Sequence, residues 1–354
     1  MSRTADKTGG IPPFFATFPR KKQVKCAVEV IPMKKQILLS FLAGAVMPLV
    51  LAALFQKTPP VPEAESESIS PTLSIRESDR EITLTVQNPS GNLQQMSLGE
   101  YLEGVVLAEM PADFEPEALK AQAVVARTYT RKRMEGSKHN VACVCMDPGC
   151  CQGWRSAEEY LSQGGRSAAV EKIRSAVRDT DGLVLCYDGK LIDATYFSCS
   201  GGMTEDAVAV WGQDVPYLQS VQSPGEEEAP RFTDSVTFSP AQFAGRLGLS
   251  ASGDPTAWFG TVTHTDGGGV ASMVIRGKTY SGTQLRSLLG LRSTAFQIQA
   301  TVDAVTVTTR GFGHRVGMSQ YGAQAMAKEG HTCQEILAHY YTGAELVREE
   351  YYGN

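Results

Sequence analysis

The sequence predicts a mixed α+β domain that follows an N-terminal transmembrane helix. Three observations support this fold class. Residues 37–55 form an uncharged, mostly apolar run, and residues 56–74 are a linker rich in proline, glutamate and serine. In residues 75–354, strand-like and helix-like segments follow one another in mixed order, without an internal repeat or a further domain-sized linker. We therefore expect a single mixed unit after the linker.

The run 37–55 has the length and the flanking charges of a membrane anchor. As a helix its 19 residues would span roughly 28 Å, at about 1.5 Å per residue, which is close to the thickness of a bilayer core. Lys34 and Lys35 precede the run and acidic residues follow it, which places residues 1–36 in the cytoplasm. The pattern predicts a single-pass protein of the cell membrane whose C-terminal domain lies outside the cytoplasm.

Two features near this anchor have alternative interpretations. Met33 stands directly before the lysines and is a candidate for the true start of the chain, and an extended N-terminal tail is the alternative. A cleaved signal peptide would also combine lysines with an apolar run, but no small-x-small cleavage site follows at a suitable distance. We therefore prefer an uncleaved anchor.

Composition limits the partners of the folded part. The chain has 354 residues, of which 42% are hydrophobic and 20% are charged, enough to bury a substantial core. Its formal net charge of -5 gives no broad basic surface, so nucleic acid is excluded as a natural partner.

The first folded elements are a strand at 81–86, a turn at 88–92 and two helices. Apolar side chains recur at helical spacing from Leu98, and the second helix begins near Pro116, a residue favoured in the first helical turn. This second helix extends to about Arg133, and its many alanines permit close approach of other elements.

Glu109 is the first candidate for chemistry. It falls four residues after Val105 on the apolar stripe of the first helix, directly before the break that Pro111 imposes. Burial raises the pKa of a carboxyl group, which is what a general acid near neutral pH requires. The alternative is a glutamate at a helix end that simply reaches water.

A cysteine-rich loop, 139–154, follows the two helices. His139, Cys145 and Cys151 are spaced six residues apart and are ligand types that zinc selects, and three such ligands would leave one coordination position open. Cys143 and Cys150 are additional thiols, so one of them could replace a ligand, or the two could form a disulfide. The residues alone leave zinc and disulfides equally open.

The later segments predict shorter elements. A helix is expected at 167–178, and the turn dipeptide Asp188-Gly189 joins expected strands at 183–187 and 191–197. Cys186 and Cys199 flank this hairpin and could face each other, or either could be a buried thiol. The remaining expected elements are short helices after Ser239-Pro240 and at 284–289, strands at 258–264, 270–275, 296–300 and 302–308, and a last helix opened by the capping box of Thr332 and Glu335.

Three sequence blocks, in order, resemble the stage II sporulation protein D family of peptidoglycan lytic transglycosylases. The first contains the Glu-Met-Pro step at 109–111 and the alanine-rich helix, the second runs from 194 to 217 through Gly201-Gly202, and the third is the glycine-rich block 311–323. Cys199 departs from the small hydroxyl residue that the family pattern would have there. No Gly-x-Ser-x-Gly or His-Glu-x-x-His motif supports a serine or zinc hydrolase instead.

The resemblance implies an enzyme that cleaves the MurNAc–GlcNAc bond of peptidoglycan and leaves a 1,6-anhydro-MurNAc end. Glu109 matches the family's catalytic acid, and neither Glu103 nor Asp113 is an obvious second acid. Substrate contacts are expected from five further residues, namely Gln122, Arg127, Tyr217, Ser319 and Gln320. The glycines Gly201-Gly202 are expected either to set a turn or to line the sugar cleft.

The resemblance also implies a cofactor, a location and a partner. Some members of the family hold a structural zinc through one histidine and two cysteines of this loop, which match His139, Cys145 and Cys151 best. The implied setting is engulfment during endospore formation, at the mother-cell membrane facing the septal wall. The implied partners are glycan strands and a cell-wall amidase, stage II sporulation protein P. A non-catalytic peptidoglycan-binding module that enhances an amidase is the alternative function.

Overall fold

A long central helix, α2 (Pro116–Glu135), organises the computed structural model, which describes residues 78–349. The helix is buried on nearly all sides, and its small alanines allow four other helices to pack closely around it. These helices are α1 (Leu98–Glu109), α4 (Ser167–Asp179), α8 (Gln320–Lys328) and α9 (Cys333–Tyr340). The expected helices at the start of the domain are confirmed, as is the Thr332–Glu335 capping box of α9.

Short strands complete this first lobe. β1 (Thr83–Gln87) pairs with β2 (Leu93–Ser97) in antiparallel and with β3 (Val144–Cys145) in parallel orientation. The sequence analysis missed β2, because only Met96 of its side chains is buried and the segment therefore lacks apolar alternation. The short helices α3 (Ala157–Ser162) and α5 (Ala207–Trp211) lie in the connections.

The expected hairpin around Asp188-Gly189 is correct at its turn and wrong in its second strand. Both turn residues have positive φ, and β4 (Leu183–Tyr187) pairs there with β5 (Lys190–Leu191) and on its other side with β14 (Glu345–Arg348). The chain then leaves the hairpin. β6 (Tyr196–Phe197) pairs instead with β13 (Met318–Ser319), which brings two of the three motif blocks together.

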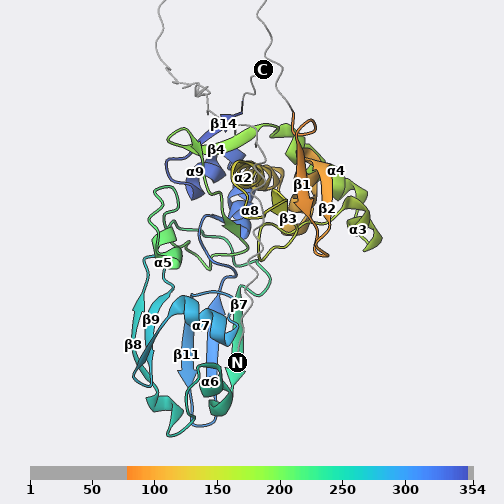
Figure 1. Cartoon of the computed structure of the whole chain (residues 1–354). Helices are drawn as coiled ribbons and strands as arrows, with labels where there is room; N and C mark the ends of the chain where they lie inside the picture. The colour runs from red at the N-terminus through yellow and green to blue at the C-terminus, as the bar shows by residue number, and fades with distance from the viewer. Residues whose placement is uncertain (1–77, 350–354) are drawn as a thin grey trace, which may run out of the picture.

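Residues 233–310 form a second lobe with its own hydrophobic core (Figure 1). One sheet has the order β11-β12-β7 and the other has the order β10-β9-β8, and two short helices pack with them. The first sheet consists of β7 (Thr233–Phe238), β11 (Phe296–Ala300) and β12 (Val305–Arg310). The second consists of β8 (Phe259–His264), β9 (Val270–Ile275) and β10 (Lys278–Ser281), and the helical elements are α6 (Pro240–Arg246), η1 (Pro255–Ala257) and α7 (Gly282–Leu289).

The two lobes meet at a buried ion pair. Arg315, in the third motif block of the first lobe, lies 2.8 Å from Glu205 and also donates to the carbonyl of Gly267 in the β8–β9 turn. Glu205 in turn accepts from the amide of Gly269 and the hydroxyl of Thr265. The mixed α+β class is therefore confirmed, and each lobe has a large hydrophobic cluster of its own, whereas one mixed unit was expected.

The expected membrane anchor, residues 37–55, lies outside the described residues, as do the segments 1–36 and 56–74 that flank it. Within residues 78–349, no helix combines the length and the apolar character needed to cross a membrane.

Candidate active site and metal centre

Glu109 is the last residue of α1, and the extended backbone of Met110 before Pro111 ends the helix there. Its side chain is half-buried. The amide of Gly153 donates a hydrogen bond to Glu109 Oε1 at 2.6 Å. Burial raises the pKa of the Glu109 carboxyl, and the Gly153 amide and the side chains of Gln320 and Tyr196 oppose this rise.

A cleft of about 340 Å³ opens beside Glu109. Tyr129, Tyr196, Phe197 and Gln320 contribute to its walls, together with the glycine-rich block around His314. Glu109 is the one carboxylate among the described residues that line the cleft. Of the two other acids considered, Glu103 faces away from it and lies 3.2 Å from Arg174, and Asp113 is exposed. The cleft thus presents a single acid.

Tyr196 and Gln152 belong to the site although the sequence analysis did not single out either. The Tyr196 hydroxyl donates to Gln152 Oε1 at 3.3 Å, and Gln152 Nε2 donates to Thr130 of α2 at 3.0 Å. Burial, and next the charge of Glu109, raise the pKa of Tyr196, so its hydroxyl stays protonated. The parallel pairing of β6 with β13 places Tyr196 here, and that pairing has no signal in the local sequence.

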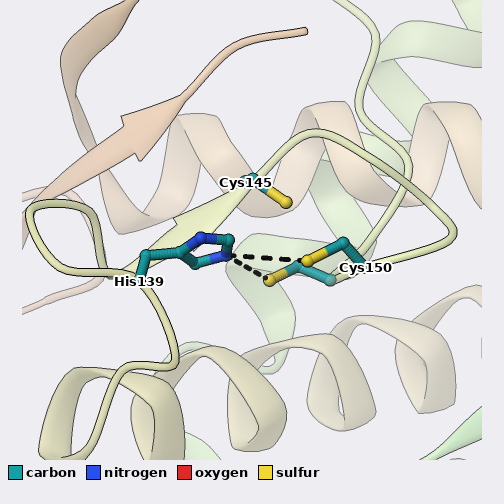
Figure 2. Close-up of side chains that lie close together, drawn as sticks. His139, Cys145 and Cys150 are labelled. Atoms are coloured by element: carbon teal, nitrogen blue, oxygen red, sulfur yellow. Dashed lines mark hydrogen bonds between the residues drawn. The ribbon is translucent and has the colours of Figure 1, made fainter. Parts of the chain in front are cut away.

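The cysteine loop brings together four potential metal ligands. The ligand atoms of His139, Cys145, Cys150 and Cys151 all lie within 4.8 Å of one another. His139 Nε2 is 3.3 Å from Cys151 Sγ and 3.8 Å from Cys150 Sγ, and the side chains of His139, Cys145 and Cys150 converge in Figure 2. One histidine with three thiols is a donor set that structural zinc sites use.

Cys150, which the sequence analysis considered only as a replacement ligand, joins His139, Cys145 and Cys151 in the cluster. Cys143 lies outside the cluster. The four cysteines of the loop are free thiols, so the loop contains no disulfide, which was the alternative to a zinc site. Four protein ligands close a tetrahedral site and leave no open position, which favours a structural role over a catalytic one.

The His/Cys cluster and Glu109 are joined by the end of the same loop. Cys151 lines the cleft, and two residues later Gly153 holds the Glu109 carboxyl through its amide. A Cβ at Gly153 would lie 2.9 Å from Glu109 Oε1, so a side chain there would crowd the acid. The ring of Trp154 packs directly on Gly104 of α1. The end of the loop therefore packs closely against α1, the helix that carries Glu109.

Gln320 lies on the cleft, and its neighbour Ser319 does not. Gln320 is buried in the wall, where its side chain lies close enough to Glu109 to lower the pKa of that carboxyl, and its Nε2 makes no hydrogen bond of standard geometry among the described residues. Ser319 is the N-cap of α8, accepts from the amide of Gly322 at 3.2 Å, and hydrogen-bonds with the carboxylate of Glu226. Ser319 thus positions Gln320 and does not itself line the cleft.

The structure places Arg127 and Gln122 away from the cleft, contrary to the expected substrate contacts. Arg127 is 0% exposed and pairs with Asp79 at 2.7 Å, and its Nη1 donates to the carbonyl of Leu183 at 3.2 Å. Gln122 is also 0% exposed. Both lie on α2, whose central position buries residues on every face.

Tyr217 is a third residue that the structure places elsewhere. Its hydroxyl accepts from the amide of Asp193 at 3.0 Å, and its ring centroid is 5.5 Å from that of Tyr187. The side chain therefore packs on the β4–β5 hairpin and does not line the cleft.

The Gly201-Gly202 turn encloses a buried carboxylate, that of Glu226. The amides of Gly201 and Gly202 donate to Glu226 Oε2 at 2.8 and 3.2 Å, and the thiol of Cys199 donates to the same oxygen at 3.4 Å. Cys199 is free, so the expected facing of Cys186 and Cys199 does not give a disulfide. These glycines serve turn geometry, and they do not line the cleft.

Fold and site together define a mixed α+β protein with one half-buried cleft acid held by a loop that carries a His/Cys cluster. Comparison with known families finds a match over the same part of the chain. The family model SpoIID, described as stage II sporulation protein, matches residues 87–187, a range that contains both Glu109 and the cluster.

Two relatives show the family. Stage II sporulation protein D of Bacillus subtilis is 42% identical over 269 residues, 74% of this chain and 78% of that protein. Stage II sporulation protein D of Bacillus amyloliquefaciens is 38% identical over 289 residues, 80% of this chain and 82% of that protein. The chain belongs to the stage II sporulation protein D family, and this membership supports a role in sporulation.

A more distant relative carries a different name. The amidase enhancer of Bacillus subtilis is 28% identical over 305 residues, which is 70% of this chain and 40% of that protein.

Proposed function

We propose that the protein is a lytic transglycosylase that cleaves the MurNAc–GlcNAc bond of peptidoglycan glycan strands and leaves a 1,6-anhydro-MurNAc end. The observation that carries this proposal is the single acid of the cleft, Glu109. A hydrolase with two carboxylates needs a second acid across the bond. In contrast, when the C6 hydroxyl of the same sugar displaces the leaving oxygen, a single carboxyl can act first as the general acid and then as the general base.

Glu109 has the surroundings for both steps. Its raised pKa favours the protonated carboxyl, which donates its proton to the glycosidic oxygen while the bond from that oxygen to C1 breaks. The resulting carboxylate is stabilised by the Gly153 amide. It then takes the proton of the C6 hydroxyl of the same sugar as O6 bonds to C1, which restores the acid without consuming water.

The neighbouring groups position the acid and the substrate. The side-chain amide of Gln320 lies beside Glu109 and offers Nε2 to the carboxylate or to a sugar hydroxyl, and the neutral hydroxyl of Tyr196 also lies beside Glu109. A zinc ion held by His139, Cys145, Cys150 and Cys151 would supply folding energy to the loop that ends at Gly153. Its role in this proposal is structural.

The proposed setting follows the family. The chain would act from an uncleaved membrane anchor at residues 37–55, with its C-terminal domain facing the septal wall during engulfment. A cell-wall amidase, stage II sporulation protein P, is the proposed partner. The amidase enhancer among the relatives supports an association with cell-wall enzymes and also supports the alternative function, a non-catalytic module that enhances an amidase.

The test is mass spectrometry of purified glycan strands after incubation with the full-length protein. Anhydro ends are expected from the parent, and Glu109→Gln should reduce their rate of formation by about 10²–10⁴-fold, the usual contribution of general acid–base catalysis. Glu103→Gln is the matched control, because Glu103 lies on the same helix and faces Arg174. Reducing ends would indicate hydrolysis, and an absence of cleavage would favour the amidase-enhancing module.

A further inference from the structure

Two large aromatic side chains stand exposed beside the cleft. Phe312 is 43% exposed and is part of the cleft wall, and Trp211 is 44% exposed at the end of α5. Single exposed apolar residues are ordinary on protein surfaces. These two differ because both lie next to the same cleft residue, His314, which is two residues from Phe312 in the chain and in ring contact with Trp211.

Phe312 is held rigidly with one ring face covered. Its amide and carbonyl pair with those of Cys199 at 2.7 and 3.1 Å, which fixes the backbone. The guanidinium of Arg292 lies 3.9 Å from the ring centroid. The ring is therefore pre-positioned, and its exposed area faces the cleft side.

Trp211 is connected to the cleft through His314. The two ring centroids are 5.4 Å apart, and His314 also contacts Phe197 at 5.5 Å. Burial lowers the pKa of His314 to about 4, so the imidazole is neutral at neutral pH. Its Nδ1 accepts from the amide of Val316 at 3.1 Å. The rings themselves are thus uncharged, while Arg292 covers one face of Phe312 and the charge of Arg286 contributes to the lowered pKa of His314.

The charges around the cleft indicate the class of ligand. The described lining residues include one carboxylate, Glu109, and no lysine or arginine. A strongly anionic polymer would find no cation among the described residues that line the cleft. A neutral, hydroxyl-rich chain with apolar C–H faces fits both the rings and the hydrogen-bonding side chains such as Gln320.

We propose that Trp211 and Phe312 form a stacking platform for the sugar rings of a glycan strand, on the side of the cleft next to Glu109. The identity of the strand rests on the proposed function. The C–H faces of pyranose rings pack on the exposed ring faces, and this contact holds the strand while Glu109 acts on the adjoining bond. Because both side chains are exposed and Phe312 is fixed through its backbone, their truncation should leave the fold intact.

The experiment measures binding apart from cleavage. Full-length Glu109→Gln protein is titrated with a soluble β-1,4-linked oligomer of GlcNAc, with and without Trp211→Ala or Phe312→Ala. Each truncation should weaken binding roughly five- to tenfold, in the range of a single ring-stacking contact. Trp211→Phe should retain most of the affinity, because it keeps a ring at this position.

Val302→Ala is the matched control, because Val302 is 63% exposed in the second lobe and should not affect binding. If Trp211→Ala and Phe312→Ala bind the oligomer as tightly as Val302→Ala does, the platform is refuted. That result would leave the role of Glu109 untouched. Conversely, failure of the parent to produce anhydro ends would refute the proposed chemistry without affecting the measured contribution of the two rings to binding.

Discussion

The two lobes bury different kinds of side chain. The first lobe encloses charged and amide groups, among them Arg127, Gln122 and Glu226. Between residues 233 and 310, every buried side chain is apolar, aromatic or a small hydroxyl. Burying a charge costs several kcal/mol unless its partners are well placed. The difference teaches that the first lobe depends on specific buried ion pairs and hydrogen bonds, such as those of Arg127 and Glu226, whereas the second is packed through apolar contact.

The largest effect that would test this contrast is expected at the cluster of His139, Cys145, Cys150 and Cys151. Structural zinc contributes on the order of 10–16 kcal/mol to the folding of small zinc domains, as much as the whole stability of a typical protein. Cys150→Ala and Cys151→Ala should each lower both the zinc content and the melting temperature, and the double variant should lose zinc altogether. Metal analysis together with thermal unfolding checks this.

Cys143→Ala is the control, because Cys143 belongs to the same loop and lies outside the cluster. We expect one zinc per chain in the parent and in this variant. Unchanged zinc in the double variant would show that the cluster does not bind the metal.

A smaller effect is expected at the buried pair of Arg127 and Asp79. Arg127→Met leaves the Asp79 carboxylate buried without its partner, which should cost about 3–5 kcal/mol of unfolding free energy, measured by denaturant titration. Leu285→Met, in the second core, nearly conserves apolar volume and should cost less than about 1.5 kcal/mol. Equal losses in the two variants would remove the distinction between the lobes.

The same variant also tests the placement of Arg127. Because its side chain does not line the cleft, the folded fraction of Arg127→Met should cleave glycan at nearly the parent rate. A large loss of activity in folded protein would restore the substrate contact that the sequence analysis expected.

The smallest effect concerns pH. Because burial raises the pKa of Glu109, the acid form persists above the ordinary value of 4.5. Activity should be full below the raised pKa and should fall about tenfold per pH unit above it, since the first step needs the protonated carboxyl. The pH dependence of kcat/KM measures this.

Stability should follow the same sign. A carboxyl whose pKa is higher in the folded than in the unfolded state makes a favourable contribution that is full below pH 4.5 and is lost as pH rises through the folded pKa. Glu109→Gln should therefore gain stability relative to the parent as pH rises. A constant difference between the two melting curves across this range would argue against a raised pKa.

Periodicity and capping predicted much of the first lobe. The apolar stripe before Glu109 defines α1, and Thr332 with Glu335 marks the start of α9, because these signals are local. The position of Glu109 at a helix end beside a proline could also be predicted from the sequence. The spacing of His139, Cys145 and Cys151 also anticipated three of the four members of the His/Cys cluster.

Long-range pairing explains what the sequence analysis missed. Arg127 meets Asp79 from 48 residues away, and Glu226 meets Ser319 across 93 residues, so neither partnership leaves a local pattern. Cys150 and Cys143 look alike in sequence, and only the path of the loop selects the first as a ligand. The second core could not be predicted from a linker in the sequence, because the chain enters and leaves this lobe on two directly paired strands, β7 and β12, with Thr233 opposite Arg310.

That pairing gives the second lobe a simple relation to the rest of the chain. The polypeptide enters at Thr233 and leaves at Arg310 on neighbouring strands, which lie about 5 Å apart. Whatever is folded between these points leaves the route of the chain through the first lobe unchanged. Residues 233–310 are therefore a topological insertion with adjacent ends, and its loops reach back to the cleft wall, where the carbonyl of Arg292 accepts from the amide of Gly313.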